Sequence, residues 1–180
     1  MVWTAPMTAT AGAFTAANFN LHIRDNLNVQ SPALATVIGS HFVSTAANTL
    51  VKRKNASAYV ATSNTMTASG SYADLAIPGP TYTVTTGTKA IVGISAFTGN
   101  SAAGVTNRQW MSIAVSGATT TAASDTWALM MTQNAASNYQ CASVWTLMTL
   151  NAGANTFTAQ YRVSAGTGTF YSRGLVVIPL

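Results

Sequence analysis

Charged residues are scarce in this sequence of 180 residues. It contains eight Lys or Arg, three Asp and no Glu, so only 6% of its residues are charged, whereas soluble proteins average roughly 25%. This composition argues against a disordered chain, a coiled coil and most metabolic enzymes. The 48% of apolar residues is enough for a substantial core. Ala, Thr and Ser are the most frequent residues, and they predict an uncharged surface of the kind that suits oligomers and particles.

Long hydrophobic runs are also missing. A membrane-spanning helix needs about 20 consecutive apolar residues, whereas the apolar stretch at residues 90–97 is short and is broken by Gly and Ser. The first residues have neither the basic start nor the continuous apolar run of a signal peptide, so we expect the mature protein to begin at Met1. We therefore expect no membrane insertion.

Residues that carry catalytic or metal chemistry are few. Asp25, Asp74 and Asp125 lie in three separate segments, which argues against paired carboxylates for acid-base catalysis, and the last two are expected to cap turns. Two His and one Cys are too few for a typical metal site, and the single Cys141 is expected in the core. The sequence has no nucleophile elbow and no phosphate-binding glycine loop. We expect no enzymatic activity, no metal and no cofactor.

The net charge of +5 does not by itself indicate a nucleic-acid partner. The basic residues are scattered except at residues 52–54, and no aromatic residue follows that cluster before Tyr59. Single-stranded nucleic acids are typically bound by basic residues interleaved with aromatic side chains. We therefore expect residues 52–55 to form a solvated loop tip, with no nucleic acid bound.

The first 30 residues predict a docking segment. Thr15 is a candidate N-cap for a helix that runs to about Asn28, with an apolar stripe formed by Phe19, Ile23 and Leu27. A helix of about a dozen residues is marginal when isolated in water, so it must pack against its own β domain, a neighbouring copy of the chain or another protein. Trp3 lies too near the N-terminus to reach a domain core easily, and an anchoring role suits it better.

Residues 31–57 are expected to be a connector. Pro32 ends the predicted helix. Val37 and Ile38, together with Phe42 and Val43, are compatible with either a short strand or a buried loop.

From residue 58 to residue 180 the hydrophobic period changes to two, which predicts strands with one buried face. The alternating segments are residues 82–84, 111–115, 127–131 and 157–163. Residues 90–97 and 144–150 are apolar on both faces, as in strands that are covered on both sides. The apolar strand at residues 174–180 is expected to be central in a sheet or buried at an interface. About eight strands, separated by Gly- and Pro-containing turns and without intervening helices, predict an all-β antiparallel sandwich or jelly roll.

Several aromatic residues fall on these predicted strands. Core or subunit-interface positions are favoured over an exposed sugar-stacking surface for Trp110, Trp127 and Trp145. With Tyr161 and Tyr171, they are the candidates for a trimer interface or a ligand-facing surface.

Several short motifs resemble bacteriophage and prophage virion proteins of the minor tail or tail-fibre type. The N-terminal motifs are Trp3-Thr4-Ala5-Pro6, Ala11-Gly12 and the segment 15–27, whose core is Asn20-x-x-Ile23-Arg24-Asp25-Asn26-Leu27. The C-terminal motifs are residues 71–75 leading to Gly79-Pro80, residues 114–118, 123–128 and 155–162, and the final Ile178-Pro179-Leu180. Together they cover most of the chain except the connector.

The resemblance implies a trimeric jelly roll, similar to the C1q and tumour-necrosis-factor folds, that projects from the tail or fibre of a virion. The domains would be an N-terminal docking segment (1–30), a connector (31–57) and the jelly roll (58–180). The implied virion-anchor residues are Trp3, Pro6, Phe19, Ile23, Arg24, Asp25 and Leu27.

The partners implied are two further copies of the chain and other virion proteins, with assembly in the bacterial cytoplasm. Two alternatives remain open at this stage. One is a capsid-decoration or head-fibre protein at threefold sites, and the other is a carbohydrate-binding module that recognises a glycan on the host surface.

Overall fold

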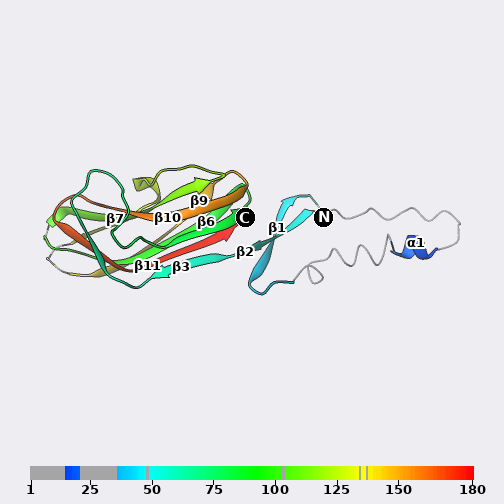
Figure 1. Cartoon of the computed structure of the whole chain (residues 1–180), viewed down its shortest axis with the longest axis horizontal. Helices are drawn as coiled ribbons and strands as arrows, with labels where there is room; N and C mark the ends of the chain where they lie inside the picture. The colour runs from blue at the N-terminus through cyan, green and yellow to red at the C-terminus, as the bar shows by residue number, and fades with distance from the viewer. Residues whose placement is uncertain (1–14, 21–35, 48, 103, 134, 137) are drawn as a thin grey trace. The chain divides into compact units, whose positions relative to one another are not determined.

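The computed structural model describes residues 15–20, 36–47, 49–102, 104–133, 135–136 and 138–180 (Figure 1). The chain divides into two compact units, Met1–Lys54 and Asn55–Leu180. The boundary thus lies just before the strand Ala56–Val60, whereas the sequence-based boundary at residue 58 falls inside that strand. Among the described residues, none of the helices has the length and apolar character needed to span a membrane.

The first unit contains a short helix and a two-stranded antiparallel ribbon. Helix α1 is Ala16–Phe19, and residues 21–28 of the predicted helix lie outside the described residues. Strands β1 (Ser40–Ala46) and β2 (Thr49–Lys54) pair with each other. The prediction of a loop tip at residues 52–55 is therefore wrong for residues 52–54, which belong to β2. Exposed and half-buried positions alternate along β2, as in a strand with one covered face, and this places basic side chains on both sides of the ribbon.

The second unit is a sandwich of two antiparallel sheets. One sheet has the order β5-β10-β7-β8, formed by Thr81–Thr86, Gly153–Val163, Gly104–Gly117 and Leu129–Gln133. The other has the order β3-β11-β6-β9, formed by Ala56–Val60, Thr167–Pro179, Lys89–Asn100 and Gln140–Thr149, and β4 (Asn64–Thr67) also pairs with β11. From β4 to β11, every connection except β7 to β8 crosses between the sheets, as in a jelly roll. The predicted all-β fold is confirmed.

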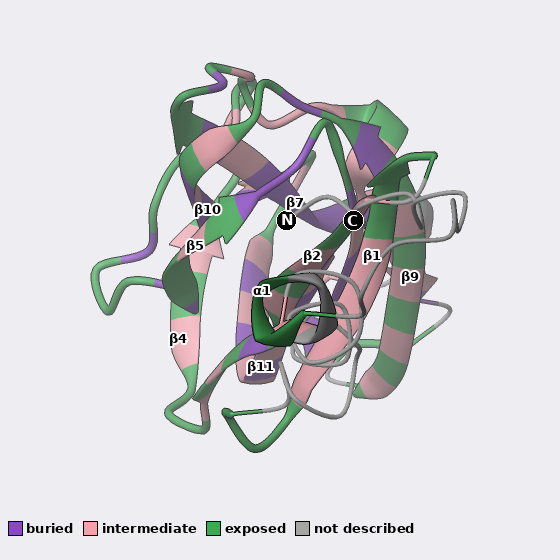
Figure 2. Ribbon diagram, turned by 90° about the vertical axis from the view of Figure 1, so that its right-hand side faces the viewer, coloured by how far each residue is buried: buried purple, intermediate pink, exposed green. Residues whose placement is uncertain are grey.

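The core lies between the two sheets, and β10 shows how the sequence builds it. Its apolar residues recur at every second position and are fully buried at Phe157, Ala159, Tyr161 and Val163. Side chains at alternate positions of a strand share one face, so this segment presents a continuous apolar surface to the opposite sheet. Figure 2 shows the resulting alternation of buried and less buried positions along the strands.

A buried polar network joins the two sheets without ions. The backbone N–H of Asn100, on β6, donates to Gln133 Oε1 on β8 at 2.7 Å. The Asn100 side chain donates to Gln109 Oε1 on β7 at 3.2 Å, and Gln133 Nε2 returns a bond to the Thr98 carbonyl at 3.1 Å. Satisfied networks of this kind strengthen a core and specify its arrangement, which suits a chain with so few charged residues.

Two local predictions around Trp127 are wrong. This residue belongs to the 3₁₀ turn η2 (Asp125–Trp127), and the strand begins only at Leu129. The Asp125 side chain does not cap the turn. Its carboxylate accepts hydrogen bonds from the Tyr72 hydroxyl and the Arg162 guanidinium, both at 2.8 Å. A carboxylate gains more from a charged partner than from a turn N–H, and the turn brings it within reach of Arg162.

Candidate functional site

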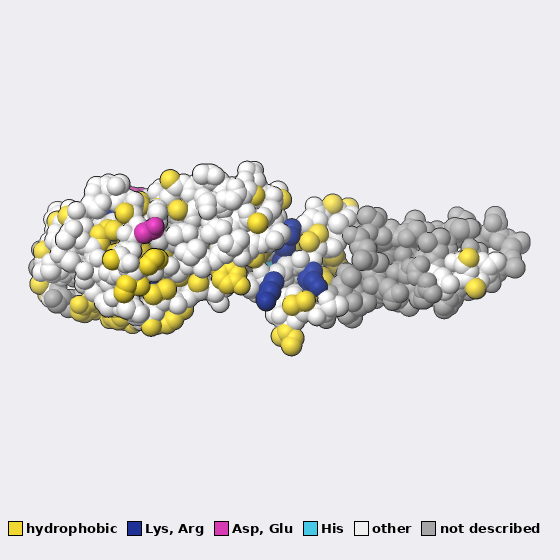
Figure 3. Space-filling view, viewed as in Figure 1, with side chains coloured by type: hydrophobic (Ala, Val, Ile, Leu, Met, Phe, Trp, Pro, Cys, Tyr) yellow, Lys and Arg dark blue, Asp and Glu magenta, His cyan; other side chains and the backbone are white. Residues whose placement is uncertain are grey.

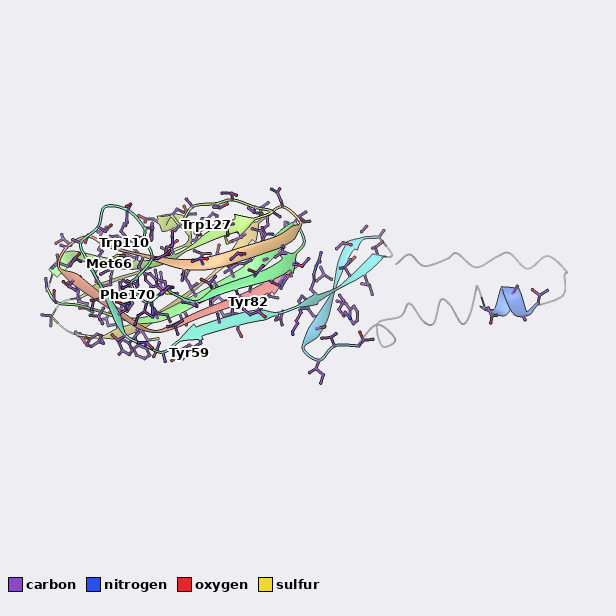
Figure 4. All side chains as sticks on the ribbon, in the orientation of Figure 1. Tyr59, Met66, Tyr82, Trp110, Trp127 and Phe170 are labelled. Carbon is purple, nitrogen blue, oxygen red and sulfur yellow. The ribbon has the colours of Figure 1, made fainter. Side chains whose placement is uncertain are left out.

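The most distinctive surface of the second unit is the side of the β3-β11-β6-β9 sheet that faces away from the other sheet. We call it the outer face. Its large apolar and aromatic side chains are Tyr59, Ile91, Phe97, Trp145, Leu147, Tyr171, Val176 and Ile178. Tyr59, Trp145 and Leu147 are more than half exposed, at 64%, 56% and 54%. In Figure 4 Tyr59 lies on the outside of the sandwich, whereas Phe170 of β11 points between the sheets.

Strand β9 accounts for most of this exposure. We predicted from its apolar residues that both of its faces are covered, but within one chain this is wrong. β9 lies at the edge of its sheet, and exposed residues alternate with inward-facing ones along its length. Its inward residue Met148 is buried, whereas Trp145 and Leu147 reach solvent. An edge strand with large exposed apolar side chains is a surface on which proteins associate.

The same alternation corrects the prediction for Cys141. Its thiol is not in the core, because the residue shares the outward side of β9 with Trp145. In the sheet register it lies opposite Phe97 of β6. It is the single cysteine of the chain and is exposed.

Small residues in the neighbouring strands shape the outer face. Gly93 lies opposite Trp145, and a Cβ at this glycine would come 2.6 Å from Cε3 of the indole. The ring therefore rests directly on the backbone of β6, a way of covering strand glycines with an aromatic side chain. Between this ring and Tyr59 lies a shallow hollow of about 400 Å³, with Ser95 and Gly174 among its lining residues.

An aromatic cluster continues the outer face toward one end of the sheet. The rings of Phe97 and Tyr171 stack with centroids 5.0 Å apart. Tyr139 meets Tyr171 edge-on at 5.4 Å and packs over Gly99. Contacts of this geometry add about 0.5–1.5 kcal/mol each beyond the area they bury, so these rings hold one another in place.

The outer face is almost free of charge. Among the outward-facing positions of its four strands, Lys89 at the start of β6 is the one charged residue. Figure 3 shows hydrophobic side chains gathered on the part of the unit where β3 and β11 lie, with no Lys or Arg among them. Large exposed apolar side chains gathered on one face are typical of a protein–protein contact rather than of a free surface.

The structure separates the five predicted aromatic residues into different environments. Trp145 and Tyr171 lie on the outer face, and Trp127 is half-buried against the core. Trp110 is 8% exposed, with the Arg162 guanidinium 4.0 Å above its ring. The interpretation of Tyr161 as an interface or ligand-facing residue is wrong, because its inward position on β10 buries it completely.

Most predicted anchor residues lie outside the described part of the chain. These are Trp3, Pro6, Ile23, Arg24, Asp25 and Leu27. Phe19 ends helix α1. Tyr59, Phe97 and Leu147 were missed as interface candidates, although the alternation that buries Ala96 and Met148 already assigns Phe97 and Leu147 to the opposite side of their strands.

Comparison with known proteins gives matches in structure only. No protein-family model and no curated protein sequence matches the chain. The Eiger TNF structure from S. frugiperda aligns with 71% of this chain and 94% of its own, at 11% identity and a TM-score of 0.48. The isomalto-dextranase of Arthrobacter globiformis T6 complexed with panose aligns with 69% of this chain and 23% of its own, at 13% identity and a TM-score of 0.36.

A carbohydrate-binding domain also resembles the fold. The C-terminal CBM6 domain of LamC from Zobellia galactanivorans aligns with 68% of this chain and 98% of its own, at 9% identity and a TM-score of 0.28. Such likenesses concern the fold alone, since one architecture carries many unrelated functions. Its own strand order makes the chain an all-β antiparallel protein of the jelly-roll type. What it does has to be argued from its own surfaces.

Proposed function

We propose that this chain is a non-enzymatic structural protein of a bacteriophage virion. Three copies associate through the outer face into a trimeric jelly roll that projects from the tail or fibre, and the first 30 residues anchor it. The observation that carries the proposal is the outer face itself, a sheet surface with large exposed apolar side chains and one charged residue at its margin.

The partner that fits the outer face best is the same surface of another copy of the chain. A partner with charged contact residues would leave those charges without counter-ions, because the outer face offers no acidic side chain and only Lys89 at its edge. Burying an unpaired charge is costly, whereas joining apolar surfaces contributes roughly 25 cal/mol for each Å² buried. An uncharged face therefore favours a partner as apolar as itself, and each copy supplies one.

A homomeric association also explains how a chain with few ions becomes stable. The second unit has one ion pair among its described residues, Arg162 with Asp125, and its side chains are 22% and 59% exposed. Exposed pairs contribute at most about 1 kcal/mol. Covering Trp145 and Leu147 between copies would add a larger apolar term, from which the entropy cost of association is subtracted. The number three comes from the resemblance to trimeric virion tips.

The anchor half of the proposal rests on the sequence. Phe19, Ile23 and Leu27 form an apolar stripe with helical spacing, and Trp3 precedes it. Arg24 and Asp25 would orient the segment through polar contacts to another virion protein. The jelly roll is an independent compact unit from Asn55 onward, so the anchor can be altered without touching the core of the sandwich.

Incorporation into particles tests this function. Phe19→Asp places a charge in the apolar stripe, and we expect the variant chain to be absent from purified virions while its jelly roll remains folded by circular dichroism. Asn28→Asp, which adds the same charge at a polar position outside the motif segment 15–27, is the matched control and should be incorporated. Normal incorporation of Phe19→Asp would refute the anchor.

A further inference from the structure

A second surface feature of the jelly roll lies away from the outer face. It is a pocket of about 510 Å³ beside β7 and β10 of the other sheet, closed on one side by the loop at residues 68–70. We call it the Arg162 pocket. Its principal lining residues are Ser69, Arg108, Trp110, Asp125, Arg162 and Ser164.

Aromatic rings hold the Arg162 side chain in a fixed position. Its guanidinium carbon lies 4.0 Å from the centroid of the Trp110 ring and 5.2 Å from that of Tyr72. One terminal nitrogen donates to Asp125 Oδ2 at 2.8 Å, and the Tyr72 hydroxyl donates to Asp125 Oδ1 at the same distance. Arg162 and Asp125 are therefore positioned before any ligand arrives, which lowers the entropy cost of binding.

Tyr72 stays a hydrogen-bond donor at any physiological pH. Its burial, and then its hydrogen bond to the Asp125 carboxylate, raise the pKa of Tyr72 well above its ordinary value. The phenol thus keeps its proton and continues to orient Asp125.

The pocket has more hydrogen-bonding capacity than the chain uses. Of the two terminal nitrogens of Arg162, one donates to Asp125, and no hydrogen bond joins the other to a described residue. Arg108 is exposed, and no hydrogen bond or ion pair joins its guanidinium to another described residue. The Asp125 side chain is 59% exposed, so its carboxylate can accept further bonds from solvent or ligand. Two cations and one anion leave the pocket with a net positive charge.

We propose that the Arg162 pocket binds a sugar that carries a carboxylate or a phosphate group. The inference rests on the proposed function, because a virion protein that projects outward meets the acidic glycans of a cell surface. Arg108 and Arg162 supply donors for the anionic group, since a guanidinium binds a carboxylate or phosphate through parallel N–H bonds. Asp125 accepts bonds from sugar hydroxyls. A bare anion would gain the guanidinium contacts but would be repelled by this carboxylate, so the pocket favours a ligand with both groups.

Binding of defined sugars to the full chain tests the proposal. Titration calorimetry would compare glucuronic acid, N-acetylneuraminic acid and glucose 1-phosphate with glucose and inorganic phosphate. We expect at least one acidic sugar to bind about tenfold or more tightly than both glucose and inorganic phosphate. The carboxylate and phosphate sugars separate the two sources of the anionic group. Equal binding of inorganic phosphate, or no binding of any acidic sugar, would overturn the proposal.

Substitutions then assign the roles of Arg108 and Asp125. Arg108→Gln should weaken binding of the acidic sugar about tenfold or more without a cost to folding, because the side chain is exposed. Asp125→Asn should remove the preference for the acidic sugar over inorganic phosphate. Lys89→Gln removes a cation that does not line the pocket and should bind like the parent chain. If Arg108→Gln binds as tightly as Lys89→Gln, the assignment of the pocket is wrong.

The outcomes separate this inference from the proposed function. The mass of each sample is measured in parallel by light scattering. A trimer that binds no acidic sugar would overturn the pocket and leave the proposed assembly untouched. A monomer that binds the acidic sugar would overturn the trimer and leave the pocket in place.

Discussion

Tyr161 is a large polar side chain that is buried in the interior of the sandwich. It is fully buried, tilts against Phe170 with ring centroids 4.8 Å apart, and lies 5.6 Å from the Arg173 guanidinium. Its hydroxyl has no hydrogen-bond partner among the described residues. Burial raises the pKa of Tyr161 to about 12 from an ordinary value of 10.0, although the charge of Arg173 opposes the change.

This raised pKa predicts a loss of stability in alkali. The folded state holds the phenolic proton more tightly than the unfolded state, so its contribution is complete below pH 10 and is lost as the pH rises toward 12. We expect the free energy of unfolding, measured with urea, to fall across this range. The free energy of unfolding of the Tyr161→Phe variant should fall less steeply over this range. Near pH 7 the substitution should change stability by no more than about 1 kcal/mol, because it removes an unsatisfied hydroxyl. Equal slopes for both proteins would contradict the assignment.

Gly93 is a second residue whose identity matters for the surface above it. Gly93→Ala would place a methyl group against the Trp145 indole, which lies directly over this position, so the ring must move outward. We expect the variant to associate about tenfold or more weakly by sedimentation velocity, because interfaces depend on close complementarity at aromatic contacts. Gly70→Ala, which has no neighbouring atom within 4 Å, is the control and should associate normally. Unchanged association of Gly93→Ala would show that this ring is not part of the contact.

At the scale of elements, strand β9 supplies the exposed side chains through which we expect the outer faces of different copies to associate. Trp145→Glu would place one carboxylate per copy in the proposed contact, and we expect it to dissociate the assembly into folded monomers, because an unpaired charge is costly to bury. Tyr82→Glu alters an exposed aromatic residue on the other sheet and should leave the assembly intact. Light scattering distinguishes the two. If the Trp145→Glu variant remains assembled, the contact between copies does not include this part of the outer face.

The strands show which elements can be predicted from the hydrophobic pattern of the sequence and which cannot. The alternation at residues 157–163 and 111–115 predicted β10 and β7, because both strands bury one regular apolar face. The pattern of β9 was misleading, since a strand that covers the core on one side and associates on the other has the same composition as a central strand. The ribbon at residues 40–54 was not predicted as such, because basic side chains occupy half of β2.

The candidate sites could be predicted only in part, because the hydrophobic pattern does not show whether an aromatic residue faces the core or the surface. Trp145 and Tyr171 stand out as aromatic residues on predicted strands, but no local pattern separates them from Tyr161, which is in the core. The Arg162 pocket joins residues more than 90 positions apart, Ser69 with Arg162. Its assembly depends on the crossing of strands between the sheets, which the sequence pattern does not encode locally.

At the scale of the whole molecule, the proposed placement on the virion predicts the number of copies of the chain in each particle. A trimer on a tail or fibre predicts few copies per particle and effects of its loss on adsorption. A decoration at threefold sites of the capsid predicts many copies and a loss of head stability. Quantitative mass spectrometry of purified particles, with the major capsid protein as the internal standard, separates the two placements. We expect the low copy number.

The most direct test of the account is the absolute mass of the protein in solution. Light scattering would be applied to the full chain and to a fragment beginning at Asn55, which keeps β3 intact. We expect the full chain at about three times its 18.6 kDa mass, and the fragment also at three times its own mass, because the outer face lies entirely within the second unit. A full chain that remains monomeric at high concentration would contradict the central claim.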